Sequence, residues 1–420
     1  VIDVGAIMHS WLEQPGYPVV DVTVDDGKLK LSQQQFFIGA GEEVGRQWQI
    51  PLNGNYDVVP QILDHPALEL GNYEQLRAEN AQPFRLNVGN KSHFIVRYSK
   101  VLLDDILSEL DQLNAIDQLQ ILQDLRLLAE GSWISYAEIV PLLGKFADSH
   151  SSVVNDALYR LAGDLKKFVQ PDSVEEKNLQ KLFNQLSAAQ VQRLGWKTKA
   201  DESNDDQLIR PYVLNAALYA KNDEAIQVAH RLFEQNQHQL AGLSADIRRY
   251  VLSNEVKNFG STSLFENLLN QYRQSTDPSY KADLSAALTA TADIQQIKQI
   301  IEKFEDAGTI KPQDLRAWFR GLLANAKGQQ LTWDWIRNDW QWLEDTVGGD
   351  MEFNTFITVI AGIFKTPERL AEFKVFFEPK LQTPGLTREI TMDIKVIEGR
   401  VRLIQEEKEA VNAAIAKIVK

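Results

Sequence analysis

The hydropathy pattern of the chain changes its period near residue 100, so the two sides of this point must fold differently. Before residue 100, apolar and polar residues alternate with the period of two that is typical of half-buried strands. The clearest case is a predicted hairpin with the turn signal Asp26-Gly27 and the strand residues Val20, Val22, Val24, Leu29 and Leu31. After residue 100, apolar residues recur with the helical period, in runs such as Leu119, Leu122, Leu125 and Leu128.

The part with the period of two is expected to be a small β-sandwich over residues 16–99. Further short strand signals follow the hairpin at Phe36–Ile38, Trp48–Leu52, Phe84–Val88 and Phe94–Tyr98. Gly89-Asn90 lies between the last two and predicts a turn that joins them. Ahead of the sandwich, residues 1–15 predict a short helix that is capped by Asp3 and ends at Pro15-Gly16.

The helical part, residues 100–420, is expected to be a solenoid. Its helices carry ordinary start signals, such as the predicted caps Ser244 and Thr366, the latter followed by Pro367. A single hydrophobic core stops growing near this length, which favours stacked HEAT- or armadillo-like helix pairs that form a concave bowl. The predicted fold class is therefore multi-domain and mainly α, with a small β-sandwich followed by an α-helical solenoid.

Composition and charge exclude several classes of function. The chain has 420 residues, no cysteine and a formal charge of −14. It therefore has no disulfide framework and no cysteine zinc site, and it lacks the basic block that binding to nucleic acid requires. The longest apolar run, Phe356–Phe364, is much shorter than the roughly 20 residues that span a bilayer. We expect neither nucleic acid nor membrane among its partners.

Sequence motifs for catalysis are missing. The six histidines include no HExxH pair, and there is no P-loop, dinucleotide fingerprint or GxSxG elbow. The segment Gly349–Asn354 is close to a GxMEN motif, with which zinc aminopeptidases clamp a peptide amine, but Phe353 is inserted. The favoured alternative is a helix start after a Gly-Gly link. Four tryptophans suggest either a ligand platform or, because helical spacing puts two of them on one face, core packing: Trp333, Trp335, Trp340 and Trp342.

Several segments, taken in order, resemble the zinc-dependent aminopeptidases of the aminopeptidase N type, which are gluzincin metallopeptidases. The opening IMHSWLEQPGYPVV, residues 7–20, is similar to the junction between the catalytic domain and a β-sandwich in that family. Trp48–Leu52 resembles its W-x-I-P-L strand, whereas His93–Tyr98 departs from the family pattern at the glycine and shifts the arginine. The helical segments that match are Ile121–Ala129 with Gly131 and Ile134-Ser135-Tyr136, Leu194-Gly195-Trp196, Leu208-Ile209-Arg210, residues 222–233 and Gln313-Asp314 through Trp340.

This resemblance implies a C-terminal region without its catalytic machinery, from a bacterial lysyl or leucyl aminopeptidase. The zinc ligands, the general-base glutamate and the GxMEN clamp would lie in a preceding catalytic domain, so we expect no cofactor, no metal ligand and no catalytic residue in this chain. Residues 1–15 would be the last helix of that domain. The absence of an initiator methionine and the start within a helical pattern favour a piece of a longer protein. The lack of cysteine is compatible with a cytoplasmic location, which we expect for the parent.

The resemblance also implies what the helical bowl does. It would cover the active site of its own catalytic domain, shape a closed chamber for peptide substrates, and show no activity alone. Some family members reach into this chamber with basic side chains, and Arg210 is the candidate here, with a structural ion pair as the alternative. Lys311 stands where an arginine is common, and we assign it no role. The competing hypothesis is a free-standing helical-repeat adaptor, which would lack the uncovered apolar surface that a missing domain leaves.

Overall fold

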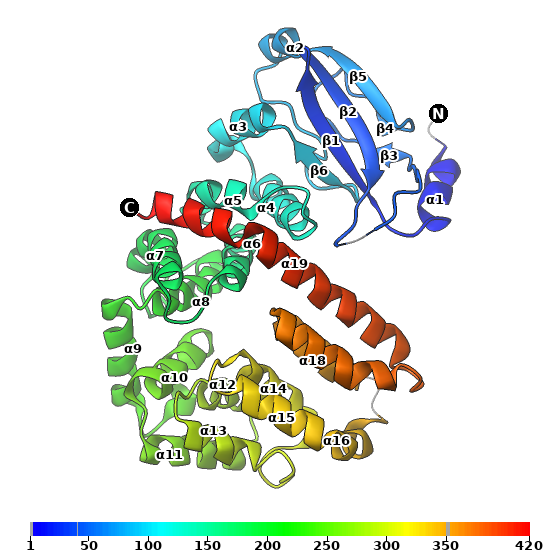
Figure 1. Cartoon of the computed structure of the whole chain (residues 1–420). Helices are drawn as coiled ribbons and strands as arrows, with labels where there is room; N and C mark the ends of the chain where they lie inside the picture. Colours follow the sequence, from blue (N-terminus) through cyan, green and yellow to red (C-terminus); the bar gives the residue numbers. More distant parts are fainter. Residues whose placement is uncertain (1–2, 40, 350–352) are drawn as a thin grey trace. The chain divides into compact units, whose positions relative to one another are not determined.

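The computed structural model describes residues 3–39, 41–349 and 353–420. The chain divides into two compact units (Figure 1). The first comprises Val1–Leu165 with Glu409–Ile418, and the second comprises Lys166–Lys408 with Val419–Lys420. The predicted fold class, mainly α with a small β-sandwich before a helical solenoid, is confirmed.

The first unit contains a four-stranded sheet in the order β5-β2-β1-β6 (Figure 1). Its strands are β1 Pro18–Asp25, β2 Lys28–Gln35, β5 Ala67–Asn72 and β6 Ile95–Tyr98. Strands β1 and β2 form the predicted hairpin, in which Asp25 lies opposite Lys28. Asp26 and Gly27 have φ values of 48° and 72°, which is the left-handed turn geometry that suits the twist of a hairpin.

A second, two-stranded sheet completes the sandwich. It pairs β3 Ile50–Pro51 with β4 Ile62–Leu63 in antiparallel fashion. Gln33 on β2 reaches the chain that enters β3, because its Nε2 donates to the Trp48 carbonyl at 3.0 Å and its Oε1 accepts from the Trp48 amide at 2.8 Å. Both sheets contribute to one buried core, which includes Val20, Val22, Leu29, Leu31, Trp48, Ile50, Leu52 and Leu63.

Two strand predictions are wrong, because residues 36–38 and 84–88 have irregular backbone. The amide of Leu86 donates to the hydroxyl of Tyr98 at 3.0 Å instead of to a strand partner. Asn87 has a φ of 52°, which no strand residue adopts. Strand β6 pairs in parallel with β1 and not with this segment. The alternation of apolar and polar residues over 84–88 therefore belongs to a loop and not to a strand.

The first unit also holds the short helices of the sandwich and the first helices of the helical part. The side chain of Asp3 accepts from the Ala6 amide at 3.1 Å, so the predicted cap of α1 is confirmed. The helices are α1 Val4–Leu12, α2 Tyr73–Glu79, α3 Lys100–Ser108, η1 Leu110–Gln112, α4 Ala115–Glu130, α5 Tyr136–Ile139, η2 Val140–Phe146 and α6 Ser152–Asp164.

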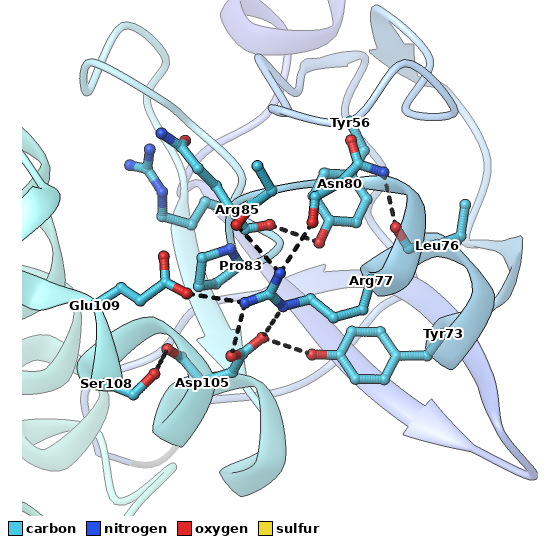
Figure 2. A network of polar contacts seen from close by, with 12 residues as sticks. Tyr56, Tyr73, Leu76, Arg77, Asn80, Pro83, Arg85, Asp105, Ser108 and Glu109 are labelled. Carbon is cyan, nitrogen blue, oxygen red and sulfur yellow. Dashed lines mark hydrogen bonds and ion pairs between the residues drawn. The ribbon is translucent and has the colours of Figure 1, made fainter.

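An arginine on α2 ties the sandwich to α3 (Figure 2). Arg77 Nε donates to Asp105 Oδ2 at 2.7 Å, and its NH2 donates to Glu109 Oε1 at 3.0 Å. The Tyr73 hydroxyl donates to the same Asp105 oxygen at 3.0 Å. The remaining Arg77 nitrogen, NH1, donates to the Asn80 carbonyl at 2.9 Å. All the guanidinium nitrogens are therefore engaged, which fixes α2 against α3.

Two carboxylates of α4 make a second connection. Asp117 pairs with Arg85 at 3.0 Å and accepts from the Gly89 amide at 2.7 Å. Asp124 accepts from the Val96 amide of β6 at 3.1 Å. These contacts join the loops and edge strand of the sandwich to α4 within the first unit. The domain ranges 1–15, 16–99 and 100–420 stay predictions.

Helices that are close in sequence pack on one another in the second unit, as a solenoid requires: α7 on α8, α8 on α9, α9 on α10, α10 on α12, α12 on α14 and α14 on α15 (Figure 1). The Thr366 side chain accepts from the Arg369 amide at 3.2 Å, so the predicted cap of α18 is confirmed. The elements of this unit are η3 Leu165–Phe168, α7 Val174–Leu194, α8 Asn204–Tyr219, α9 Asp223–Asn236, η4 Leu240–Gly242, α10 Ala245–Phe259, α11 Thr262–Gln274, α12 Pro278–Leu288, α13 Ile294–Ile301, η5 Pro312–Asp314, α14 Leu315–Ala324, α15 Gln329–Asn338, α16 Trp340–Val347, α17 Thr355–Ile363, α18 Pro367–Phe377, η6 Glu378–Lys380 and α19 Thr387–Ile418, whose residues are divided between the two units.

A lysine near the end of the second unit reaches back to its beginning. The ammonium of Lys365 donates to the carbonyls of Lys166, Lys167 and Val169 at 3.3, 3.4 and 3.3 Å. These carbonyls end η3 and would otherwise lack helical partners. Burial lowers the pKa of Lys365, and the three carbonyl dipoles favour its charged form.

Candidate functional site

The second unit has a basic hollow of about 490 Å³ where α11, α12, η5 and α14 meet. Four cationic side chains and one carboxylate are among its described lining residues. We call this site the basic hollow and define it by the cations Arg273, Lys281, Lys311 and Arg316 together with the carboxylate of Asp314.

Each cation comes from a different short segment of the chain. Arg273 lies in the last turn of α11, and its Nε donates to Thr309 Oγ1 at 2.9 Å. Lys281 lies on α12, with its ammonium 4.2 Å from the centroid of the Tyr272 ring. The aromatic ring thus makes a cation–π contact with the ammonium, which keeps its positive charge.

The other two cations flank η5. Lys311 is the exposed residue before Pro312, and this proline starts the 3₁₀ turn because its fixed φ suits a first helical position. Arg316 follows in the first turn of α14, where its NH1 donates to Thr355 Oγ1 at 2.8 Å. The turn of η5 therefore brings Lys311 and Arg316 to the same hollow.

Asp314, the one carboxylate among the described lining residues, has a buried partner. Asp314 accepts from the Tyr272 hydroxyl at 3.2 Å, and this hydroxyl accepts from the indole of Trp318 at 3.2 Å. Burial raises the pKa of Tyr272 to about 12, so the phenol stays a donor at neutral pH. Among the described lining residues, four cations thus stand beside one engaged carboxylate, in a chain of net charge −14, and Arg273 and Arg316 already have polar partners. The arrangement suits an anionic group such as a carboxylate.

Arg210, the sequence candidate for the substrate chamber, is fully buried in α8. Its NH2 pairs with Glu202, which is also buried, and its NH1 lies 3.3 Å from Asp246 Oδ2. Its Nε donates to the Gly195 carbonyl at 3.2 Å. These contacts are those of the structural ion pair that the sequence left open, and the chamber role stays a prediction.

The tryptophan cluster is core. Trp333 is 0% exposed and Trp340 is 4% exposed, so core packing is confirmed for both. Trp333 packs edge-to-face on Phe364 with 5.2 Å between ring centroids, and its indole donates to Glu372 at 3.0 Å. The helical spacing of Trp333 and Trp340 predicted this packing, because both rings lie on the buried face.

Among residues 3–39, 41–349 and 353–420, no group of three or more His, Cys, Asp or Glu side chains is arranged so that it could hold a metal ion. The Nδ1 atom of His230 lies 2.8 Å from Glu255 Oε2, and the His230 ring stacks on Phe259 with 3.9 Å between ring centroids. The segment close to GxMEN, Gly349–Asn354, lies partly outside the described residues, at 350–352.

The sequence reasoning noted Lys311 and missed the rest of the basic hollow. Arg273 and Lys281 are single cations on polar helix faces, and no pattern separates them from solvated residues. Their convergence depends on the packing of Tyr272 against Trp318, whose ring centroids are 5.0 Å apart at 86°. The match at Gln313-Asp314 was the only signal near this place.

Comparison with known sequences assigns most of the chain to one family of C-terminal domains. Residues 84–399 match the sequence model of the ERAP1-like C-terminal domain, which covers the end of the sandwich and most of the helical part. The chain belongs to this family.

Named relatives agree with the assignment. The chain is 60% identical over 419 residues to an aminopeptidase N of Lactobacillus helveticus, and the match covers 100% of this chain and 50% of that protein. It is 54% identical over 415 residues to an aminopeptidase N of Lactobacillus delbrueckii subsp. lactis, covering 99% and 49%. With the aminopeptidase M1-A of Oryza sativa it shares 24% identity over 422 residues, covering 97% and 47%. The chain thus spans about half the length of these relatives, and the resemblance to a C-terminal region of aminopeptidase N is confirmed.

No helix among the described residues is long and apolar enough to cross a bilayer.

Proposed function

We propose that this chain is the non-catalytic C-terminal part of a zinc aminopeptidase that removes N-terminal residues from peptides, and that its helical unit covers the active site and shapes the substrate chamber. The observation that carries the proposal is the match of the whole chain to about half of aminopeptidase N at 60% identity. Zinc and the catalytic groups belong to the other half, and this chain should be inactive alone. The cytoplasmic location stays a prediction.

An uncovered apolar stripe on α1 supports the missing-partner part of this proposal. Val4, Met8 and Leu12 are spaced four residues apart and are 65%, 48% and 75% exposed. On another side of the helix, the Trp11 indole donates to the Gln49 carbonyl at 3.0 Å and holds α1 on the sandwich. A row of exposed apolar side chains on one helix face indicates a contact surface. We assign it to the catalytic part of the same enzyme.

The basic hollow supports the chamber part of the proposal. A peptide that enters a closed chamber with its amine at the zinc site presents a free carboxylate at its other end. Arg273, Lys281 and Lys311 offer that carboxylate a net positive site on the helical unit. We therefore place the carboxyl end of short peptides in the basic hollow.

Substitution in the full-length enzyme tests the chamber assignment. The double variant Arg273→Ala/Lys311→Ala should raise KM for a tetrapeptide with a free carboxylate about tenfold, while kcat changes little, because binding remote from the reacting bond is lost. A tetrapeptide with an amidated C-terminus should show no change in KM. Lys298→Ala/Arg388→Ala, which removes two exposed cations outside the hollow, is the matched control.

The outcome separates the parts of the proposal. Equal changes in KM for the free and the amidated peptide would remove the basic hollow from substrate binding and leave the covering role intact. The covering role is tested by adding this chain to the separately produced catalytic half. Failure to bind that half, together with binding to an unrelated protein, would favour the helical-repeat adaptor.

A further inference from the structure

A second cavity, in the first unit, has a chemistry that the peptide chamber does not explain. It measures about 290 Å³ and lies between β6, α3, α4 and the α5–η2 segment. Most of its wall is aliphatic and includes Val96, Leu125, Leu128 and Ile139. A space of this size with an apolar wall holds a small organic molecule and excludes a peptide chain.

One carboxyl group stands inside this apolar wall. The side chain of Asp124 is 9% exposed and lines the cavity from α4. Its Oδ2 accepts the Val96 amide at 3.1 Å, and Gln120 adds a side-chain hydrogen bond. Burial outweighs these two hydrogen bonds and raises the pKa of Asp124 to about 8.

The mouth of the cavity carries more negative than positive charge. Lys100 and Asp104 on α3 pair with each other, so they cancel. Glu138 remains, held by the Ser135 amide at 3.2 Å in the capping box of α5. The titratable groups around Asp124 in this cavity and nearby are Tyr17, Tyr98, Lys100, Asp104 and Glu138. Asp124 also lines a second hollow, whose further titratable groups are His93, Arg126, Asp156 and Arg160.

We propose that this cavity binds a small apolar amine, whose aryl or alkyl body fills the aliphatic wall and whose ammonium pairs with the carboxylate of Asp124. A neutral ligand would contact the aliphatic wall but would make no ion pair with Asp124 or Glu138. An organic anion would meet Asp124 and Glu138 with like charge. An ammonium gains from both, because the low dielectric around Asp124 strengthens a single ion pair.

Binding must displace one proton. At pH 7 the Asp124 carboxyl holds its proton, and the arriving ammonium turns the carboxyl into a carboxylate while the proton leaves to buffer. The charge of the site is thereby balanced. Released protons can be counted, which distinguishes this ion pair from simple filling of an apolar space.

Calorimetry on the 420-residue chain tests the proposal with phenethylammonium as the probe. We expect binding at pH 7 with close to one proton released, measured from the dependence of the heat on the ionisation enthalpy of the buffer. At pH 9 we expect almost no net release, because Asp124 is then mostly ionised and the probe is still mostly an ammonium. Asp124→Asn should weaken binding about tenfold or more, because a charged hydrogen bond is lost in a buried place. Asparagine keeps an acceptor for the Val96 amide, so the fold should hold, and Asp111→Asn at an exposed site is the control.

Two further measurements keep the test decisive. Leu103→Trp should block the probe by filling the cavity, and methyl NMR shifts at Ile121 and Ile139 should locate it. 2-Phenylethanol, which has the same body without charge, should bind more weakly by about tenfold. Equal binding of the alcohol and the amine, no proton release at pH 7, or full affinity in Asp124→Asn would overturn the proposal.

Discussion

Replacing Arg210 by alanine should destabilise the second unit strongly. The side chains of Arg210 and Glu202 are 0% and 2% exposed, so the variant leaves a buried carboxylate without its countercharge. The Glu202 Oε2 atom already has no hydrogen-bond partner among the described residues, and loss of Arg210 leaves the other oxygen without one as well. Removal of one partner of a buried ion pair typically costs about 3–5 kcal/mol.

The loss should be local before it is global. Arg210 lies on α8 and also contacts Asp246 on α10 at 3.3 Å and the Gly195 carbonyl at 3.2 Å. Native-state hydrogen exchange of the α8 and α10 amides should therefore show opening free energies lower by about 3–5 kcal/mol. The double variant Arg210→Met/Glu202→Gln should recover much of this loss, because no buried charge is left.

The same variant decides between the two roles considered for Arg210. If the opening free energy falls by less than about 1 kcal/mol, while KM for free-carboxylate peptides rises in the full-length enzyme, the structural argument is refuted and Arg210 belongs to the chamber. A large loss of stability in Arg210→Ala that Arg210→Met/Glu202→Gln restores, with KM near its original value, supports the ion pair.

Three further predictions concern stability. Gly321→Ala should destabilise the protein by about 1–3 kcal/mol, because the new Cβ would lie 2.3 Å from Thr289 Oγ1. Gly163→Ala on α6 should stabilise it by about 0.5–1 kcal/mol, because its Cβ would meet no atom within 4 Å. Thermal unfolding of both variants checks the sign of each change. Arg77→Met should cost the first unit about 1–3 kcal/mol in a urea titration, because the half-buried carboxylates of Asp105 and Glu109 lose a charged donor. Burial raises the pKa of Asp124 in the folded state to about 8, so the folded state binds this proton more tightly than the unfolded state does. The free energy of unfolding should therefore fall by about 2–4 kcal/mol as pH rises from 5 to 9. The fall should be smaller in Asp124→Asn. Unchanged pH dependence in that variant would contradict the assignment.

Local patterns predicted the parts of the fold that local physics decides. The Asp26-Gly27 hairpin, the Asp3 and Thr366 caps and the helical period after residue 100 all depend on residues a few positions apart. The strand prediction at 84–88 failed because a distant hydroxyl, that of Tyr98, takes the amide of this segment out of any strand pairing. Alternation records burial, and burial does not require a strand.

The candidate sites were less accessible to the sequence for the same reason. Arg210 was singled out from a matched arginine, yet its partners Glu202 and Asp246 are eight and 36 residues away in the chain. The basic hollow needs side chains from four elements, and the cavity at Asp124 needs an edge strand to lie over α4. Such convergence is decided by tertiary packing, which spacing in one sequence does not report.

The Lys365 contact changes how the second unit should lose its structure. A solenoid held only by neighbouring helices melts from its ends, one helix after another, as a zipper opens. Here one ammonium joins carbonyls 196 to 199 residues earlier in the chain to the end of α17, so neither terminus of this stretch can fray alone. Because this contact closes a loop over residues 166–365, we expect this stretch to unfold more cooperatively than an array held by neighbouring helices alone. The helices between η3 and Lys365 would then resist local opening until the hydrogen bonds of Lys365 break.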